Sequence, residues 1–546
     1  MGRQACFSGG GYTYSGNTTL GNYISDAYLA GNAGTAAKAA HYTYFNQGGG
    51  LPGIGFTTGD YSIFAQDEWK ATRRLSLTLG IRWEYESFPG PQLANSAVPQ
   101  TSRLNDMKTN FAPRVGFAWD PYGSGKTILR GGYGMFFARA INSTLYQALI
   151  GTGAVGSQTN PQFNAGQNCA PIFPQVIAPA QQGACLGSAS GNATVDYLDP
   201  NFKVPLIHQA DLTVETQVTN HDVFSVSWLG SWGRRLPDFV DVNLPAPTPV
   251  TFTIVDPQQQ GPIRNGTTFQ ANAFFATANK NLRPNPNFSS ITDIFSGVTS
   301  NYEALVAQFK HQLSHSVEFN ANYTWSHALD YGENNTTGAA ATSLLDPTNI
   351  RLEKGNSNQN VPNRLVVAAV ISTPWRMHGA WGYLANDFEL APAFAMQTGL
   401  PYSVGISGAS STLTVTPGSA VEKIVNTGSF NGSGGANRVP ITDRNAYQQP
   451  ETYVVDMRLS KRLLFRERYG LEFLGEAFNL ANHPNVSAVN SSAYFVNDNL
   501  EPGSKTLGAG NTLTPYSTPF GQVTGINNSN FALNVRQLQL GVRFQF

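Results

Sequence analysis

The stretch LSLTLGIRWEYE, residues 75–86, alternates apolar side chains with polar or small ones. In an extended strand, successive side chains point to opposite faces, so its leucines, isoleucine, tryptophan and tyrosine share one face. A helix would scatter the same residues around its circumference and leave no apolar stripe. The pattern therefore predicts a β-strand with one apolar and one polar face. Residues 317–326 and the C-terminal residues 537–546 alternate in the same way.

Ten further stretches share this pattern more weakly: 61–70, 110–120, 127–138, 208–219, 222–231, 301–312, 363–373, 381–402, 453–462 and 469–480. We expect a bend near Pro392 in the longest of them. Many are about 10–12 residues long, whereas a strand of a globular protein averages about 5–6. A strand that crosses a bilayer at a tilt of about 45° needs about 9–11 residues. The lengths therefore favour an all-β chain with about 13 membrane-spanning strands.

The connections between these stretches alternate in length along the whole chain. The short ones are 71–74, 121–126, 220–221, 313–315, 374–380 and 463–468, and the long ones are 87–109, 139–207, 232–300, 327–362, 403–452 and 481–534. Short periplasmic turns and long extracellular loops are typical of an antiparallel outer-membrane β-barrel. Only helices and closed barrels satisfy every backbone group in hydrocarbon, so the pattern predicts a barrel with lipid outside and a polar lumen inside.

Composition excludes several classes of protein. Charged residues make up 12% of the 546 residues, about half the usual share. Lys plus Arg and Asp plus Glu both number 34, so there is no basic surplus to bind nucleic acid. No apolar run reaches the roughly 18 residues of a membrane helix, and no apolar leader follows Met1. The odd number of expected strands and the missing leader together predict that residues 1–60 are an extracellular loop of an incomplete N-terminal barrel segment.

Six stretches together resemble the C-terminal barrel of TonB-dependent receptors, in particular the Oar-like branch. They are YSIFAQDEWKATRRLSLTLGIRWEYES (61–87), FAPRVGFAWDPYGSGKTILRGGYGMFF (111–137), NYEALVAQFKHQLSHSVEFNANYTWSHALD (301–330), GNSNQNVPNRLVVAAV (355–370), LEFLGEAFNLANHPN (471–485) and RQLQLGVRFQF (536–546). The resemblance implies that residues 61–546 are the C-terminal portion of a 22-stranded barrel with a plug. It also implies transport driven by the TonB complex, engaged through an N-terminal region absent from this sequence.

Charged side chains recur on the predicted polar faces. No nucleophile motif such as GxSxG accompanies them, so we interpret them as lumen-facing residues and not as catalytic acids. The candidates are Arg82, Glu84, Arg130, Glu318, Asp456, Arg458, Glu472, Glu476 and Arg543. The sequence departs from the family pattern at Leu474, where that pattern leads us to expect a polar lumen residue.

Cys169 and Cys185 lie in one long loop, where they form a disulfide or remain two free thiols. We expect the disulfide, because an oxidising compartment permits it, and this leaves Cys6 without a partner. The residues 123–127, GSGKT, end like a phosphate-binding loop, but the preceding glycine is missing and a strand follows, which predicts a turn. The histidines show no metal-binding spacing, so we expect no metal and no cofactor.

Val542, Phe544 and Phe546 share one face of the last strand. They are three lipid-facing positions, and the family resemblance implies in addition a C-terminal signal for the barrel-assembly machinery. Both interpretations can hold together.

These observations predict an outer-membrane transporter or receptor for a bulky solute, which is not an enzyme. The expected partners are outer-membrane lipid, the barrel-assembly machinery, the TonB complex and an unknown solute. One alternative is a surface adhesin, structural barrel or passive porin without energy coupling. A second alternative is a soluble β-rich enzyme, whose apolar faces would pack into a compact core.

Overall fold

The structure is a computed structural model. It describes residues 10–14, 18–32, 34, 38–158, 162–185, 194–276, 283–314, 316–332, 344–407, 412–414, 421–426, 429–465, 469–497, 511–526 and 535–546. Cys6 and its predicted lack of a partner lie outside these residues. Within them, no helix combines the length and the apolar character that crossing a bilayer would require.

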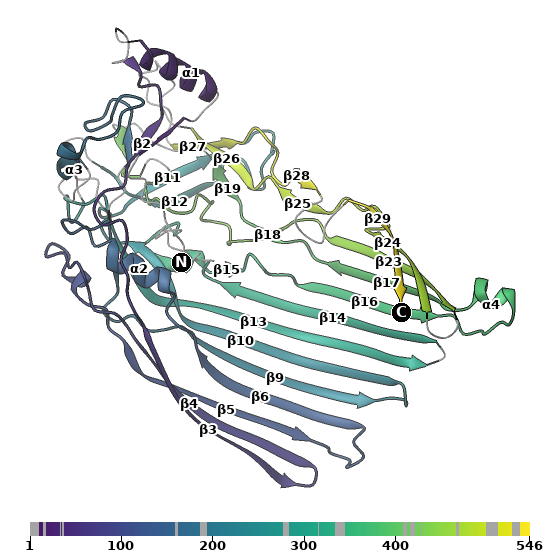
Figure 1. Cartoon of the computed structure of the whole chain (residues 1–546). Coiled ribbons are helices and arrows are strands. Elements are labelled where there is room, and N and C mark those ends of the chain that lie inside the picture. Colours follow the sequence, from purple (N-terminus) through teal and green to yellow (C-terminus); the bar gives the residue numbers. More distant parts are fainter. Residues whose placement is uncertain are drawn as a thin grey trace.

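A large antiparallel sheet dominates the described residues (Figure 1). Its thirteen main strands pair in chain order: β3 (Gly59–Thr72), β4 (Leu75–Ser87), β5 (Met107–Trp119), β6 (Thr127–Phe137), β9 (Leu206–Gln217), β10 (Asp222–Asp241), β13 (Ser290–Ser314), β14 (Val317–Asp330), β16 (Asn363–Ser372), β17 (Phe388–Gln397), β23 (Thr452–Phe465), β24 (Tyr469–Phe478) and β29 (Gln537–Gln545). Each stretch predicted from alternation overlaps one of these strands. The predicted all-β class and antiparallel sheet are confirmed.

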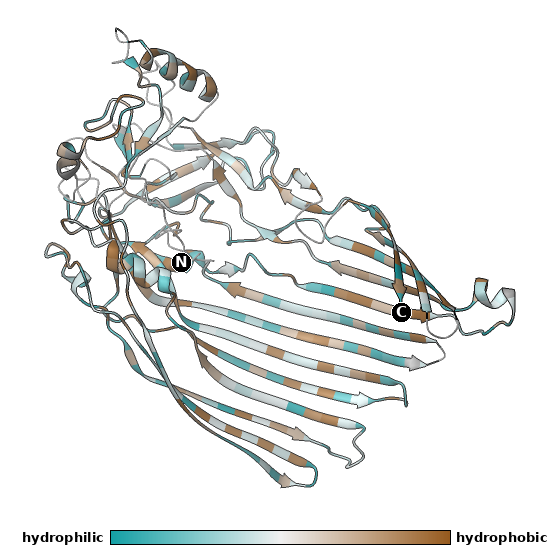
Figure 2. Cartoon of the chain, in the orientation of Figure 1, coloured by the Kyte–Doolittle hydropathy of each residue, from teal (hydrophilic) through white to brown (hydrophobic). Residues whose placement is uncertain are grey.

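The register keeps the two faces of the sheet separate. Trp83 of β4 lies opposite Ile63 of β3 and Phe111 of β5. Figure 2 shows hydrophobic and hydrophilic residues alternating along the middle strands. The apolar members are exposed, with 71% of Ile63 and 61% of Trp325 accessible, so the apolar stripes do not pack into a compact centre. The sheet is therefore built differently from a soluble sandwich.

Three predicted boundaries need correction. Strands β10 and β13 extend to Asp241 and from Ser290, beyond the predicted 222–231 and 301–312, because their far ends pack against the long connections. The stretch predicted as a strand from 381 begins instead with helix α4 (Ala380–Ala385). Pro392 causes no register shift against β23, although the ladder with β16 is interrupted opposite it, where proline has no N–H to donate.

The long connections and the segment before β3 fold into lobes at one end of the sheet. The first, which we call the disulfide lobe, contains β1 (Gly11–Thr13), α1 (Thr19–Ala30), β2 (Tyr44–Asn46), β7 (Gln162–Asn164) and α3 (Pro179–Cys185). Phe45 and Phe163 are buried at its centre, and a disulfide joins Cys169 to Cys185 beside them.

A second lobe covers the far ends of β10 and β13. Strand β8 (Thr194–Leu198) pairs in parallel with the first residues of β13, and α2 (Asn142–Ile150) packs beside it. Leu145 of α2 and Leu198 of β8 share a buried cluster with Phe239 and Ile294 from the two long strands. The 3₁₀ turn η2 (Pro99–Ser102) lies next to β8.

A third lobe, which we call the cap sheet, joins segments far apart in the sequence. Its strands pair in the order β12 (Thr268–Ala273), β11 (Thr248–Ile254), β27 (Asn511–Pro515), β26 (Ser492–Asn497) and β19 (Gly405–Ser407). Phe252, Phe430 and Tyr494 are fully buried in its core, together with Leu345, so four different long connections supply it.

The remaining elements are short. They are β15 (Gly355–Asn356), β18 (Pro401–Tyr402), β20 (Thr412–Thr414), β21 (Val421–Lys423), β22 (Tyr447–Gln448), β25 (Val486–Val489), β28 (Val523–Ile526) and the 3₁₀ turn η4 (Ile350–Glu353).

Candidate functional site

Two adjoining cavities lie at the end of the sheet from which the long connections leave. They share Ala138 and Arg139, which directly follow β6. The first measures about 530 Å³ and the second about 280 Å³. The Ala138 N–H donates to the Pro205 carbonyl at 2.9 Å, which holds together the two ends of the connection between β6 and β9.

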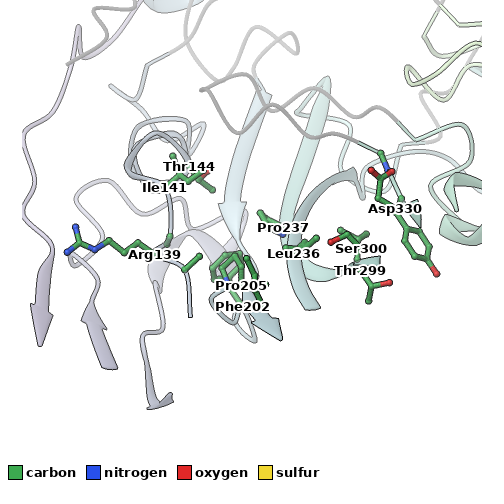
Figure 3. A pocket seen from close by; sticks show the side chains of 16 residues that line it. Arg139, Ile141, Thr144, Phe202, Pro205, Leu236, Pro237, Thr299, Ser300 and Asp330 are labelled. Atoms are coloured by element: carbon green, nitrogen blue, oxygen red, sulfur yellow. The ribbon is translucent and has the colours of Figure 1, made fainter. Parts of the chain in front are cut away.

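The first cavity has mostly apolar walls. Its lining includes Phe202, Pro205, Ile207, Leu236, Pro237 and Val298. Figure 3 shows Arg139 and Asp330 at opposite ends of this lining. Phe202 also belongs to the buried cluster of the second lobe, so one wall is fixed by that lobe's packing. An apolar pocket with a few polar groups at its ends is a common form of ligand site.

The second cavity carries charges of both signs. Arg139 forms an ion pair with Asp60, Nη2 to Oδ2 2.9 Å, and Arg82 forms one with Glu84, Nε to Oε1 2.5 Å. The Glu86 carboxylate accepts a hydrogen bond from the Ala140 N–H at 2.8 Å. The two cavities together can therefore hold a solute with an apolar part beside polar or charged groups.

Asp330 at the far end of the first cavity is held by the neighbouring loop. Its carboxylate pairs with the Arg444 guanidinium, and Arg444 Nε donates to the Glu353 carbonyl at 2.8 Å. Burial lowers the pKa of Arg444 to about 10, so this guanidinium stays protonated at neutral pH. Arg438 and Glu353 form a second buried pair at 3.3 Å, which fixes the same loop.

Only two of the nine predicted lumen residues, Arg82 and Glu84, line these cavities. The alternation pattern found them because both lie on the polar face of β4. Sequence reasoning did not single out Asp60, Arg139 or Asp330 as site residues. Of these three, only Arg139 could have been found from the sequence, because it directly follows a predicted strand at the start of a long connection.

Four other predicted residues form a second cluster on the polar face of β23, β24 and β29. Glu472 lies between Arg458 and Arg543, at 3.7 and 3.4 Å, and Arg458 approaches Glu476 at 4.0 Å. Leu474 lies on the same face, where the family pattern led us to expect a polar residue, opposite Ser460 and Gly541.

The last three predicted lumen residues are spread over other strands. Arg130 of β6 pairs with Glu215 of β9 at 3.7 Å. Asp456 accepts a hydrogen bond from the Asn479 N–H at 2.8 Å, and Glu318 lies on β14 opposite Val370. The nine residues thus line the polar face and do not converge on one site.

The C-terminal strand places Val542, Phe544 and Phe546 on its apolar side. All three are exposed, and Phe544 stacks on Tyr469 of β24 with ring centroids 6.1 Å apart. These contacts agree with the lipid-facing interpretation of the alternation.

The remaining motifs behave as local structure in the described residues. Asp120 accepts hydrogen bonds from the N–H groups of Gly123 and Gly125, both at 2.8 Å, so the GSGKT stretch is a turn. Among these residues, no group of three His, Cys, Asp or Glu side chains could hold a metal ion. His311 is hydrogen-bonded to Asp222 at 2.7 Å, and His315 lies outside the described part.

Comparison with known proteins gives one family. Residues 3–539 match the family model described as outer membrane beta barrel domain. No curated protein matches the chain.

Several solved structures are similar to the chain at low identity. One is the outer membrane transporter YddB from Escherichia coli, with 12% identity and a TM-score of 0.44 over 89% of this chain and 45% of that one. A variant of the ferric enterobactin receptor PfeA from Pseudomonas aeruginosa gives 12% identity and a TM-score of 0.41 over 92% and 50%. The FrpB iron transporter from Neisseria meningitidis gives 8% and 0.39 over 92% and 45%. The chain spans about half the length of these structures.

Proposed function

The chain belongs to the outer membrane β-barrel domain family and lies in the bacterial outer membrane, and from this premise we propose that it serves in TonB-dependent uptake or reception of a bulky solute. In this family setting the short turns face the periplasm and the long connections face the outside. We further propose that residues 61–546 are the barrel portion and that residues 1–60 belong to the extracellular side. The TonB complex would act through a region outside this sequence.

The observation that carries the proposal is the pair of cavities around Arg139. They lie at the extracellular end of the sheet, where a solute arriving from outside first meets the polar face. Their combined apolar wall and paired charges suit a solute that carries an apolar part beside polar or charged groups.

The folded extracellular lobes also support a receptor. The loop that holds Asp330 is fixed by two ion pairs, Arg444 with Asp330 and Arg438 with Glu353. A site built on rigid elements loses less conformational entropy on binding than one built on mobile loops.

Energy coupling can be tested in the native host. We would compare the parent strain, a strain without this gene and a strain without TonB, each with and without an uncoupler of the proton-motive force. The probes are fluorescent oligosaccharides, labelled peptides and ⁵⁵Fe-siderophores, all too large for general diffusion pores. We expect one probe class whose uptake requires the gene, TonB and the proton-motive force.

Two other outcomes would contradict this proposal. Gene-dependent uptake that the uncoupler does not reduce would indicate a passive porin. Gene-dependent attachment of cells to a surface, without uptake of any probe, would indicate an adhesin.

The site itself is tested by Arg139→Ala, with Arg103→Ala as the matched control. Arg103 is equally a loop arginine on the same side, but it is exposed and lines neither cavity. We expect Arg139→Ala to raise the solute concentration for half-maximal uptake and Arg103→Ala to leave it unchanged. If both variants gave the same solute concentration for half-maximal uptake, the cavities would take no part in the proposed function.

A further inference from the structure

One connection at the periplasmic end of the sheet differs from all the others there. Fifteen residues separate β16, which ends at Ser372, from β17, which begins at Phe388. The other five connections at this end contain between two and seven residues. Helix α4 forms within this connection and projects beyond the ends of the strands (Figure 1). We call residues 374–387 the turn lobe.

The turn lobe exposes large apolar side chains. Its sequence, PWRMHGAWGYLAND, contains two tryptophans, a tyrosine, a methionine and a leucine. Trp381 is 70% exposed, Leu384 66% and Trp375 50%, although side chains of this kind are ordinarily covered. Arg376 is also exposed, and no acidic residue occurs before Asp387.

Internal hydrogen bonds hold these side chains outward. Trp375 Nε1 donates to the Ala385 carbonyl at 3.0 Å. The Asn386 side chain accepts from the Met377 N–H at 2.8 Å and donates to the Met377 carbonyl at 2.9 Å. The chain reverses at Gly379, whose φ of 67° favours glycine. The exposed surface therefore belongs to a folded element.

The turn lobe is joined to the apolar face of the sheet. Phe388 of β17 lies opposite Lys461 of β23, on the same face as Leu459 and Phe473. The Lys461 ammonium donates to the Asn386 carbonyl and lies 4.7 Å from the centre of the Phe388 ring. The apolar surface of the lobe thus continues the lipid-facing surface of the strands where they reach the periplasm.

We propose that the turn lobe binds the periplasmic leaflet of the outer membrane, with its aromatic and aliphatic side chains at the boundary between acyl chains and headgroups. Tryptophan and tyrosine favour this boundary because each combines an apolar ring with a polar atom. Arg376 and Lys461 lie beside them and match the phosphate groups of the leaflet. The absence of acidic residues from 374 to 386 removes repulsion from the same phosphates. This proposal rests on the outer-membrane location and not on the transported solute.

The test places a photo-crosslinker in the full chain. Tyr383→p-benzoylphenylalanine exchanges one aromatic residue for another, and Trp381→p-benzoylphenylalanine provides a second position in the same lobe. The matched control is Ser124→p-benzoylphenylalanine, an exposed position in the turn between β5 and β6. The variants are reconstituted in vesicles of phosphatidylethanolamine and phosphatidylglycerol, and a heat-dependent shift in gel mobility verifies folding.

After illumination, mass spectrometry compares lipid adducts among the variants. We expect several-fold more adduct at position 383 or 381 than at position 124. Adduct at the control level at both lobe positions would overturn the proposal. The same variants are illuminated in living cells, where a protein adduct in place of lipid would show that the lobe docks a periplasmic protein and would equally overturn it.

Discussion

Glu472 shows what a single residue contributes inside the polar face. Its side chain is only 7% exposed and lies between two arginines, Arg458 and Arg543. Replacing Glu472 with glutamine leaves the guanidinium groups of Arg458 and Arg543 beside a neutral amide. The two ion pairs that link β23, β24 and β29 are thereby weakened. Because the arginines are partly solvated, we expect Glu472→Gln to cost about 1–3 kcal/mol, less than the loss of a fully buried partner. The measurement is the urea midpoint of unfolding from lipid vesicles.

Glu215 provides the control for this prediction. It also pairs with an arginine on the polar face, but its side chain is 39% exposed and that of Arg130 is 54% exposed. We expect Glu215→Gln to cost less than about 1 kcal/mol. Equal shifts for the two variants would mean that burial does not determine the strength of these pairs.

Asp196 makes the second lobe sensitive to pH. Burial in β8 raises the pKa of its carboxyl from 3.8 to about 6, against the opposing hydrogen bond from Gln147 Nε2 at 2.6 Å. Between these pH values the folded lobe binds more protons than the unfolded lobe. The contribution of Asp196 to stability is therefore full below about pH 4 and falls as the pH rises through 6, by at most about 3 kcal/mol. Amide hydrogen exchange of residues 194–198 measures this change.

The control for Asp196 is the variant Asp196→Asn, which cannot ionise. We expect it to reduce the pH dependence between pH 4 and 7 and to slow exchange at neutral pH. Part of the dependence should remain, because burial also raises the pKa of Asp293, opposite Tyr197 in the same strand pair, to about 6. A wild-type lobe that becomes more protected as the pH rises would contradict the sign of the effect. The neighbouring Asp241 carboxyl, whose charge also raises the pKa of Asp196, remains in both proteins.

At the scale of elements, the membrane-spanning strands could be predicted because their signal is local. Each strand has one apolar and one polar face, so alternation over about ten residues marks it. The turn lobe could not be predicted in this way. The sequence pattern predicts a short connection at residues 374–380 and assigns the apolar residues Trp381, Tyr383 and Leu384 to the strand that follows them. The far ends of β10 and β13 were missed for another reason. That of β13 pairs with β8, and both ends pack against Leu145 of α2, contacts that no local pattern records.

Strand β29 carries a prediction about assembly. Phe546 is 93% exposed and, among the residues that the structure describes, its ring stacks on that of Phe544 alone, with centroids 6.1 Å apart. Its removal therefore disturbs little packing in the folded sheet. If it forms part of the C-terminal signal, deleting Phe546 should lower the outer-membrane level several-fold while synthesis is unchanged. Gln545→Ala is the control from the opposite face. Immunoblots of fractionated membranes measure both, and normal assembly without Phe546 would reject the signal.

At the scale of the whole molecule, the extracellular lobes lay beyond sequence reasoning. Phe252 of β11 pairs with Asn511 of β27, 259 residues further along the chain. Nothing in either segment alone indicates the other. The same holds for the candidate site, where Arg139, in the connection after β6, meets Asp60 at the start of β3. Charges on a strand could be assigned to a face, but their partners depend on how the long connections fold.

The shared core of the cap sheet implies that its loops open together. Phe252 is fully buried between Phe269 and Phe430, with ring centroids 5.5 and 5.4 Å away, and these rings come from two different long connections. We expect Phe252→Ala to cost about 3–5 kcal/mol within this lobe, because it leaves a cavity in a packed core. Brief trypsin treatment of intact cells should then cut the connections after β10, β14, β17 and β24 together, while the strands stay protected in the membrane. Phe495→Ala, in the same sheet but 43% exposed, should leave the cleavage pattern unchanged. Cleavage confined to the connection that contains Phe252 would show instead that each loop folds on its own.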